Sequence, residues 1–243
     1  MTTMQDVAER AGVSAKTVSR VFNDDPHVSE RTRQAVKTAM DDLRYVPNML
    51  AVNFRERRTG VVGVAVPDIT DPFFAGVVRA IERVSRAKRQ TVAVASLGDD
   101  PADERGIVES LLRRQMDGFI LVPTSSDQRY LTSWATRVPL VFVDREPTGL
   151  RADSFVENDL GGARAAVEHL LARGHTRIAF IGDSQDVVTT RRRLDGYRDA
   201  IRATGQRPDP ALELLVSPER AATMVEEIFN RPPLPTAVFS SNS

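Results

Sequence analysis

Residues 3–23 read TMQDVAERAGVSAKTVSRVFN, two short amphipathic runs separated by Gly12-Val13-Ser14. Thr3 stands at the N-cap position of the first run, in which apolar residues recur at helical spacing. These apolar residues are Met4, Val7, Ala8 and Ala11. Gly12 suits a corner with positive φ, Val13 can fill the space between two helices, and Ser14 can cap the second one. The pattern predicts two short helices joined by a tight turn.

The second run has two different faces. In a helix its apolar residues Val18, Val21 and Phe22 turn inward. The other side chains are small, hydroxylated or basic, and they turn outward or toward the N-terminal end. They are Ala15, Lys16, Thr17, Ser19 and Arg20. Such a second helix is typical of a DNA-reading helix-turn-helix, although an ordinary helical hairpin in a larger core has the same pattern.

A third helix is predicted after a turn-rich loop at residues 23–29. Ser29 is its expected N-cap. Its predicted apolar face consists of Ala35, Val36, Ala39, Met40 and Leu43. Tyr45-Val46-Pro47-Asn48 ends this helix.

The first 48 residues carry a dense set of short motifs. They are Asp6-Val7-Ala8, Ala11-Gly12-Val13-Ser14, Thr17-Val18-Ser19-Arg20-Val21, Val28-Ser29, Thr32-Arg33, and Tyr45 followed by Pro47-Asn48. In these motifs the chain resembles the LacI/GalR family of bacterial transcription regulators. The resemblance implies an all-α helix-turn-helix DNA-binding head at residues 1–46 and a hinge helix or linker at residues 47–59.

The resemblance also implies DNA contacts at particular positions of the head. Arg20 would fork onto guanine O6 and N7 or onto phosphate, and Ala15 and Lys16 match the positions that set specificity in the family. The remaining predicted contacts carry short hydrogen-bonding groups suited to phosphate oxygens. They are Thr3, Thr17, Ser19, Asn23 and His27. Without the resemblance, a serine or an arginine on an exposed helix face is usually just solvated.

In the hinge, the resemblance places further residues against the minor groove. Asn48, Ala51 and Arg55 match the groove-facing positions, and Phe54 stands where the family has a leucine that wedges between bases. Phenylalanine is apolar and flat, as this role requires, but it is bulkier than leucine. A plain polar linker is the alternative interpretation of this segment.

The composition limits the possible functions. The 243 residues contain 33 Lys and Arg against 33 Asp and Glu, so the net charge does not indicate a nucleic-acid partner. The DNA prediction therefore depends on where the cations lie. The chain has no cysteine, which excludes disulfides and thiolate metal sites. Neither a signal peptide nor an apolar run long enough to span a membrane is present, so we expect a cytoplasmic protein.

From Gly60 onward the sequence alternates between strand and helix patterns. Strands are predicted at residues 61–67, 91–97, 118–123, 140–144, 178–182 and 236–240. Helices are predicted from Asp71-Pro72 and at residues 107–114, 130–136, 163–172, 192–204 and 220–229, with a turn at Gly161-Gly162. In the first helix Val77, Ile81 and Val84 are the expected buried stripe. Repeated units of this kind predict open parallel sheets with right-handed crossovers.

This second part resembles the α/β periplasmic-binding-protein-like (type I) effector domain of the same family. The likeness rests on Val66-Pro67-Asp68-Ile69, Asp71-Pro72-Phe73-Phe74, Phe142-Val143-Asp144-Arg145 and Gly174-His175. It implies an N-terminal lobe at residues 60–158 and a C-terminal lobe at residues 159–243. Members of the family continue past the last predicted strand, so we expect the C-terminal lobe to be incomplete in this sequence.

An effector cleft is expected beyond the carboxyl ends of the strands. A sugar-like ligand needs charged groups that bind its hydroxyls in pairs and aromatic faces that pack against its ring. The residues that match cleft-lining positions of the family are Asp68, Phe73, Phe74, Asp144, Arg193 and Asn242. Alternatively, Asp68 and Asp144 close turns or cap helices, and Phe73 and Phe74 belong to the core.

The predicted function is a sequence-specific transcription regulator, in the main interpretation a repressor. It would bind a pseudo-palindromic operator in double-stranded DNA as a homodimer, under control of a small-molecule effector, expected to be a sugar. No cofactor, metal or membrane partner is expected. A stand-alone periplasmic-type sugar-binding protein is the main alternative. An enzyme is disfavoured because His27, His169 and His175 are scattered and no catalytic set accompanies them.

Overall fold

The computed structural model describes residues 2–22, 24–46, 59–98, 100–125, 127–216, 218–230 and 232–241. The chain divides into two compact units, residues 1–59 and 60–243. Several predicted site residues lie outside the described residues. They are Asn23, Asn48, Ala51, Phe54, Arg55 and Asn242. Almost all of the predicted hinge, residues 47–58, lies outside them as well.

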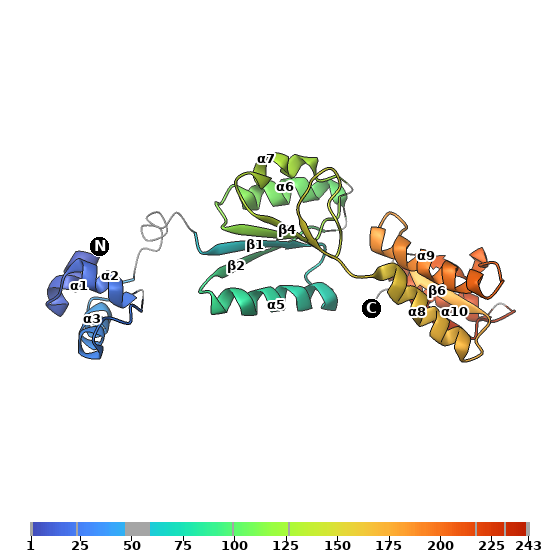
Figure 1. The fold of residues 1–243 in the computed structure, drawn as a ribbon, viewed down its shortest axis with the longest axis horizontal. Helices are drawn as coiled ribbons and strands as arrows, with labels where there is room; N and C mark the ends of the chain where they lie inside the picture. Colours follow the sequence, from blue (N-terminus) through green and yellow to red (C-terminus); the bar gives the residue numbers. More distant parts are fainter. Residues whose placement is uncertain are drawn as a thin grey trace. The chain divides into compact units, whose positions relative to one another are not determined.

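The first unit contains three helices, α1 (Met4–Ala11), α2 (Ala15–Phe22) and α3 (Glu30–Asp42), shown in blue in Figure 1. They enclose a small apolar core. Its fully or almost fully buried members are Val7, Ala8, Val18, Val21, Val36 and Ala39. The predicted helix-turn-helix with a third helix is confirmed, although Ala35 of the predicted apolar face is exposed.

The turn between α1 and α2 has the predicted geometry. Gly12 adopts φ 65°, and the N–H of Val13 donates to the carbonyl of Ala8 at 3.0 Å. Val13 packs partly buried against the core of the unit. The Oγ of Ser14 accepts a hydrogen bond from the N–H of Thr17 at 3.1 Å, which caps α2. A left-handed glycine thus ends one helix and a serine begins the next.

The second unit begins with a five-stranded sheet whose strands are all parallel, in the order β2-β1-β3-β4-β5. Its strands are β1 (Val61–Val66), β2 (Thr91–Ser96), β3 (Gly118–Leu121), β4 (Leu140–Val143) and β5 (Asp153–Phe155). Its helices are α5 (Pro72–Ala87), α6 (Pro101–Leu112), the 3-10 turn η1 (Arg129–Leu131) and α7 (Thr132–Ala135). Figure 1 shows α5 on one face of this sheet and α6 and α7 on the other.

Strand β1 shows why both faces are apolar. Val64 and Val66 pack with Phe74 of α5, whereas Ala65 between them packs with Val108 of α6. Successive side chains of a strand point to opposite faces, so a strand covered on both sides must be apolar throughout. The continuous apolar run therefore predicted a buried parallel strand, and the structure confirms it.

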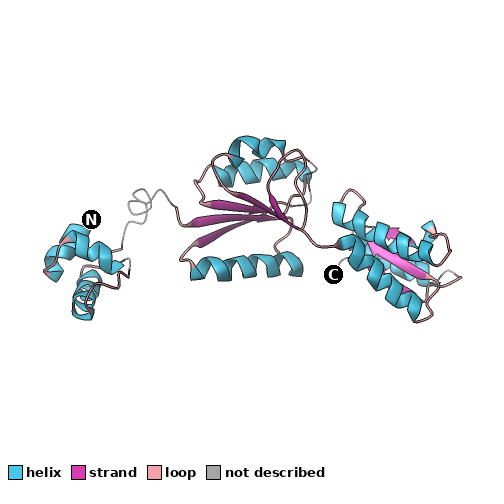
Figure 2. Ribbon diagram, in the orientation of Figure 1, coloured by secondary structure: helices cyan, strands magenta, loops and turns pink. Residues whose placement is uncertain are grey.

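The chain then forms a three-stranded parallel sheet in the order β7-β6-β8. Its elements are α8 (Asp159–Ala172), β6 (Ile178–Gly182), α9 (Val188–Ala203), the 3-10 turn η2 (Pro210–Leu212), β7 (Glu213–Leu215), α10 (Pro218–Asn230) and β8 (Ala237–Ser240). Figure 2 colours the strands of both sheets magenta. Val167 of α8 and Leu194 and Tyr197 of α9 form a core against Phe180 of β6. None of the described helices is long and apolar enough to cross a membrane.

Some predicted local features are wrong. Gly161-Gly162 is not a turn but lies inside α8, because the side chain of Asn158 accepts from the N–H of Gly161 and starts the helix early. In α5, Val84 is 55% exposed and Ser85 is buried instead. The short strands β5 and β7 were not predicted, since three residues are too few to show a period.

Helices α8 and α9 approach closely at Gly196, which generates a stability prediction. A Cβ at this position would lie 2.3 Å from the carbonyl oxygen of Leu160 and 3.0 Å from the Cβ of Ala163. The backbone oxygen cannot move away without displacing α8, so Gly196→Ala should destabilise the chain by about 1–3 kcal/mol. Urea unfolding followed by circular dichroism measures this loss.

Gly162→Ala is the matched control, because a Cβ at Gly162 meets nothing within 4 Å. Alanine has the higher helix propensity, so this variant should be neutral or more stable by up to about 1 kcal/mol. Equal unfolding midpoints for the two variants would contradict the close approach at Gly196.

Candidate DNA interface and effector pocket

The exposed surface of α2 contains the predicted DNA-reading residues. Val18 and Val21 are buried, whereas Lys16 and Arg20 are exposed and lie four residues apart on the same side of the helix. Ala15, Thr17 and Ser19 are half-buried, and Ala15 also packs against the core of the unit. The structure therefore brings these five residues together on one helix. Their contact with DNA stays a prediction.

Arg20 is held by the loop that follows α2. Its Nε donates to Oδ2 of Asp25 at 2.8 Å. Oδ1 of Asp25 accepts from the backbone N–H of His27 at 2.9 Å and contacts its Nδ1 at 3.1 Å. The hydrogen bond from Arg20, together with the N–H of His27, holds the pKa of Asp25 well below its usual range. Two predicted contact residues, Arg20 and His27, thus share one carboxylate.

Thr3 has a structural role in the described structure. Its Oγ1 accepts from the N–H of Asp6, and Oδ2 of Asp6 accepts from the N–H of Thr3, so the two residues form a capping box at the start of α1. In this cap the hydroxyl oxygen of Thr3 serves as an acceptor, so its O–H can still donate to another group. The contact of Thr3 with phosphate stays a prediction.

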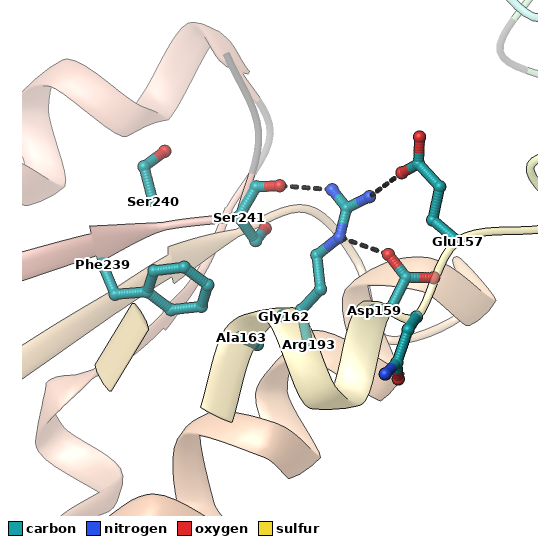
Figure 3. Close-up of a pocket in the computed structure, with 9 residues that line it drawn as sticks. Glu157, Asp159, Gly162, Ala163, Arg193, Phe239, Ser240 and Ser241 are labelled. Atoms are coloured by element: carbon teal, nitrogen blue, oxygen red, sulfur yellow. Dashed lines mark hydrogen bonds and ion pairs between the residues drawn. The ribbon is translucent and has the colours of Figure 1, made fainter. Parts of the chain in front are cut away.

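A pocket of about 340 Å³ lies beyond the carboxyl end of β8, and Figure 3 shows its lining residues. They are Glu157, Asn158, Asp159, Gly162, Ala163, Arg193, Phe239, Ser240 and Ser241. The predicted effector residue Arg193 extends from α9 into it. Its Nε donates to Oδ1 of Asp159 at 2.6 Å, and its Nη1 donates to the carbonyl oxygen of Ser241. Its Nη2 lies 3.9 Å from the carboxylate of Glu157.

Arg193 therefore joins three segments of the chain, namely the crossover before α8, the start of α8 and the end of β8. The side chain of Asp159 is only 2% exposed, and its Oδ2 has no hydrogen-bond partner among the described residues. The same holds for the buried Oγ of Ser241. The pocket thus contains two buried oxygen atoms, Oδ2 of Asp159 and Oγ of Ser241, that can still form a hydrogen bond.

Asp144 is electrostatically coupled to this pocket. It follows β4 in a left-handed conformation with φ 67°, and it is 6% exposed. Burial raises its pKa above the usual value, and the nearby cations Arg145 and Arg193 oppose this rise. The Nε of Arg145 lies 3.2 Å from Oδ2 of Asp144, and its Nη1 donates to the carbonyl of Pro123.

Asp68, Phe73 and Phe74 are not among the residues that line this pocket. Both oxygens of Asp68 accept hydrogen bonds from Thr70, which closes a turn. Phe74 of α5 is 7% exposed and belongs to the core, whereas Phe73 is 39% exposed and its ring meets that of Phe74 edge-on. The alternative interpretation thus describes Asp68, which closes a turn, and Phe74, which belongs to the core, but not the exposed Phe73. A direct role of these three residues in ligand binding stays a prediction.

Of the nine residues that line the pocket, only Arg193 was predicted from the sequence. The polar ones that were missed are Glu157, Asn158, Asp159, Ser240 and Ser241. Asn158 before Gly161-Gly162 was a recognisable signal, since asparagine is a preferred N-cap. Asp159 gave no such signal, because its negative charge in the first turn of a helix is already explained by a favourable interaction with the helix dipole. The partnership of Asp159 with Arg193 spans 34 residues, and no local pattern predicts it.

The coupling of Asp144 to two arginines generates a pH prediction. Its raised pKa means that its contribution to stability is present below the unfolded pKa and is lost as the pH rises through the folded value. Arginines favour the charged carboxylate, so both Arg145→Ala and Arg193→Ala should raise the pKa of Asp144 further. Carbon-detected NMR titration of the side-chain carboxyl measures it.

Asp68 is the internal control of this titration, because hydrogen bonds from Thr70 lower its pKa. It should titrate below the usual value in all three proteins. An Asp144 pKa that is unchanged or lower in both variants would show that the two cations do not act on this carboxylate.

Two family models match the chain. The model "Bacterial regulatory proteins, lacI family" matches residues 3–48. The model "Periplasmic binding proteins and sugar binding domain of LacI family" matches residues 59–243, which is more than half of the chain.

Individual proteins agree with these models. The chain is 35% identical over 250 residues to "Probable HTH-type transcriptional regulator EndR" of Paenibacillus polymyxa, covering 100% of this chain and 73% of that protein. It is 32% identical over 246 residues to the ribose operon repressor of Escherichia coli K12, covering 100% of this chain and 74% of the repressor. The crystal structure of the lac repressor dimer bound to operator and the anti-inducer ONPF matches with a TM-score of 0.82 and 30% identity, covering 98% of this chain and 73% of that one. The chain belongs to the LacI family of bacterial transcription regulators.

Proposed function

We propose that this protein is a repressor that binds a pseudo-palindromic operator as a homodimer, and that a small-molecule effector controls its affinity for the operator. The observation that carries the proposal is the outward face of α2, where Lys16 and Arg20 stand exposed on a helix whose other side is buried. One such head reads one half-site, so two heads related by a two-fold axis read a pseudo-palindrome. Acting on the chromosome places the protein in the cytoplasm.

The relatives support this proposal. One of them is named a ribose operon repressor, and the lac repressor was crystallised as a dimer on its operator with an anti-inducer. Both are regulators rather than enzymes, and we propose the same for this chain. When a ligand-binding domain with two conformations is linked to a DNA-binding head, a ligand that favours one conformation changes the affinity for DNA. This control needs no chemical reaction.

In the head, we propose that Arg20 reads guanine and that Ala15 and Lys16 select the neighbouring base pairs. The proposed phosphate contacts are Thr3, Thr17, Ser19, Asn23 and His27. The proposed minor-groove contacts are Asn48, Ala51, Phe54 and Arg55. Phosphate contacts position the head, whereas base contacts provide specificity. Changes of Arg20, Ala15 or Lys16 should therefore change the preferred sequence, and changes of the phosphate contacts should weaken binding to all sequences about equally.

The pocket beside Arg193 supports a neutral, hydroxyl-rich effector such as a sugar. A guanidinium donates to hydroxyl oxygens, and carboxylates accept from hydroxyl hydrogens, so Arg193 and Asp159 offer both halves of that recognition. Asp144 and Asn242 would complete the polar lining. The proposed roles of Asp68, Phe73 and Phe74 depend on the family resemblance alone.

Arg20→Ala tests the DNA proposal. The full chain is first offered a library of random duplexes, and the enriched sequence serves as the operator. Arg20→Ala should lose roughly 5- to 150-fold in preference for one G·C pair in each half-site, which corresponds to a lost bidentate base contact of about 1–3 kcal/mol. Gel-shift titration on the operator, on its single base-pair variants and on random duplex measures the loss.

Arg10→Ala is the matched control, because Arg10 of α1 is likewise exposed and paired with an aspartate, Asp42, at 2.8 Å. It removes the same charge away from α2 and should weaken all duplexes about equally. An unchanged base preference in Arg20→Ala would refute the proposed role of Arg20.

A thermal-shift screen tests the effector proposal. Pentoses, hexoses, disaccharides and nucleosides are added to the full chain, and a ligand at about 100 times its Kd should stabilise it by about 2.7 kcal/mol. Arg193→Ala should abolish the shift that the best ligand produces. Its neighbour Arg192, which pairs with Glu146 at 3.0 Å and does not line the pocket, provides the control Arg192→Ala. A shift that survives Arg193→Ala places the ligand elsewhere.

A further inference from the structure

Within the described part of the head, the guanidinium of Arg20 is bonded along one edge only. Its only bonded nitrogen among the described residues is Nε, which donates to Asp25 at 2.8 Å. The two terminal nitrogens, Nη1 and Nη2, have no acceptor there. The side chain of Arg20 is still 43% exposed despite this bond. One edge of the guanidinium is therefore held and its outer end is open.

Asp25 is itself fixed from several sides. Its backbone N–H donates to the carbonyl of Arg20 at 2.9 Å, and its Oδ1 accepts from the N–H of His27 at 2.9 Å. Arg33 of α3 donates to the carbonyl of Asp25 at 3.0 Å and to the carboxylate of Asp24 at 3.2 Å. The side chain of Arg33 is only 15% exposed. The carboxylate that holds Arg20 thus belongs to a loop that α3 anchors.

We propose that Asp25 is a positioning residue for base reading, and that it sets Arg20 to present its two terminal nitrogens end-on to guanine. Guanine offers O6 and N7 as two acceptors in the major groove, and the terminal fork of a guanidinium matches this pair. This inference depends on the proposed role of Arg20 in reading DNA. It adds a residue that is outside α2 and that does not contact the base itself.

Two physical effects make Asp25 a determinant of specificity. First, an arginine that is already held loses less rotamer freedom when it binds, which favours the one pose in which the fork meets its base. Second, the carboxylate occupies Nε and repels phosphates, so it weakens the sequence-independent attraction of Arg20 to the DNA backbone. Both effects raise the ratio of operator to random-duplex affinity.

The adjacent Asp24 provides a matched control. It is exposed, lies in the same loop and pairs with Arg33 rather than with Arg20. Asp24→Asn and Asp25→Asn remove the same charge at neighbouring positions. Both should therefore raise the affinity for random duplex by a similar factor. Only Asp25→Asn removes the carboxylate that holds Nε.

The experiment uses the full chain and gel-shift titration on the operator, on variants of each operator base pair, and on operator with 7-deazaguanine at the guanine that Arg20 reads. This analogue lacks the N7 acceptor. In Asp25→Asn, the penalty for the 7-deazaguanine and base-pair changes at that one position should fall roughly three- to tenfold. The penalties at the other positions, and all penalties in Asp24→Asn, should stay within about twofold of wild type.

A double variant separates positioning from a general effect on the loop. In the Arg20→Ala background, Asp25→Asn should cause no further loss at the guanine position, because the two residues act through one contact. Thermal unfolding of each protein reports whether the head still folds. If Asp25→Asn does not fold, Asp25→Ser replaces it, since serine can still accept from the N–H of His27 and is too short to hold Arg20.

The outcomes distinguish the inference from the function that it depends on. If Arg20→Ala changes the base preference but Asp25→Asn behaves like Asp24→Asn, the positioning role is wrong and the proposed reading by Arg20 stands. The positioning role is also wrong if Asp25→Asn lowers the affinity penalties equally at all operator positions. It is likewise wrong if Asp25→Asn has the same effect at the guanine position in the Arg20→Ala background as in the wild type. If Arg20→Ala itself leaves the preference unchanged, both proposals are refuted.

Discussion

The left-handed turn at Gly12 decides which face of α2 is available for binding. A residue with φ 65° is tolerated there because glycine has no Cβ, and the turn lets α2 begin at Ala15, directly after the Ser14 cap. With the start of α2 fixed, burial of Val18 and Val21 against α1 and α3 determines its rotation. Lys16 and Arg20 are exposed as a consequence. The DNA-reading surface is thus a result of core packing rather than a separate feature.

The second unit is organised around buried charges in a comparable way. Glu104 of α6 is fully buried, and its carboxylate accepts from the N–H groups of Thr124 and Ser125 and from the hydroxyl of Tyr130. This network fixes the segment after β3, whose Pro123 carbonyl in turn accepts from Arg145. Burying a carboxylate costs free energy unless hydrogen bonds compensate it, so these contacts favour one arrangement of the segment after β3.

The sequence was most informative where a pattern is local. Helical spacing, N-caps and a glycine turn predicted α1, α2 and α3, and the apolar run at residues 61–66 predicted β1. One wrong prediction shows how packing can outweigh a local preference. Gly161-Gly162 was interpreted as a turn because glycine weakens helices, but the Asn158 cap and the close packing of Gly196 against Leu160 outweigh that preference.

The candidate sites were less predictable than the fold. The residues of α2 followed from its periodicity, whereas the pairs Arg20–Asp25 and Arg193–Asp159 depend on how a loop or a second helix is placed. Asp68 was predicted as a cleft residue because it matches a cleft-lining position of the family, and its role in ligand binding stays a prediction. In the structure its carboxylate closes a turn with Thr70, a contact that the resemblance did not predict. A residue type at a strand end does not specify its partner.

Binding of DNA by the outward face of α2 is tested most directly by an amide NMR spectrum of the perdeuterated full chain, recorded with and without the selected operator duplex. We predict that the largest shift changes in residues 2–46 fall on α2 and on the loop at residues 24–28. Changes concentrated on α1 or on the outer face of α3, with α2 unaffected, would contradict it.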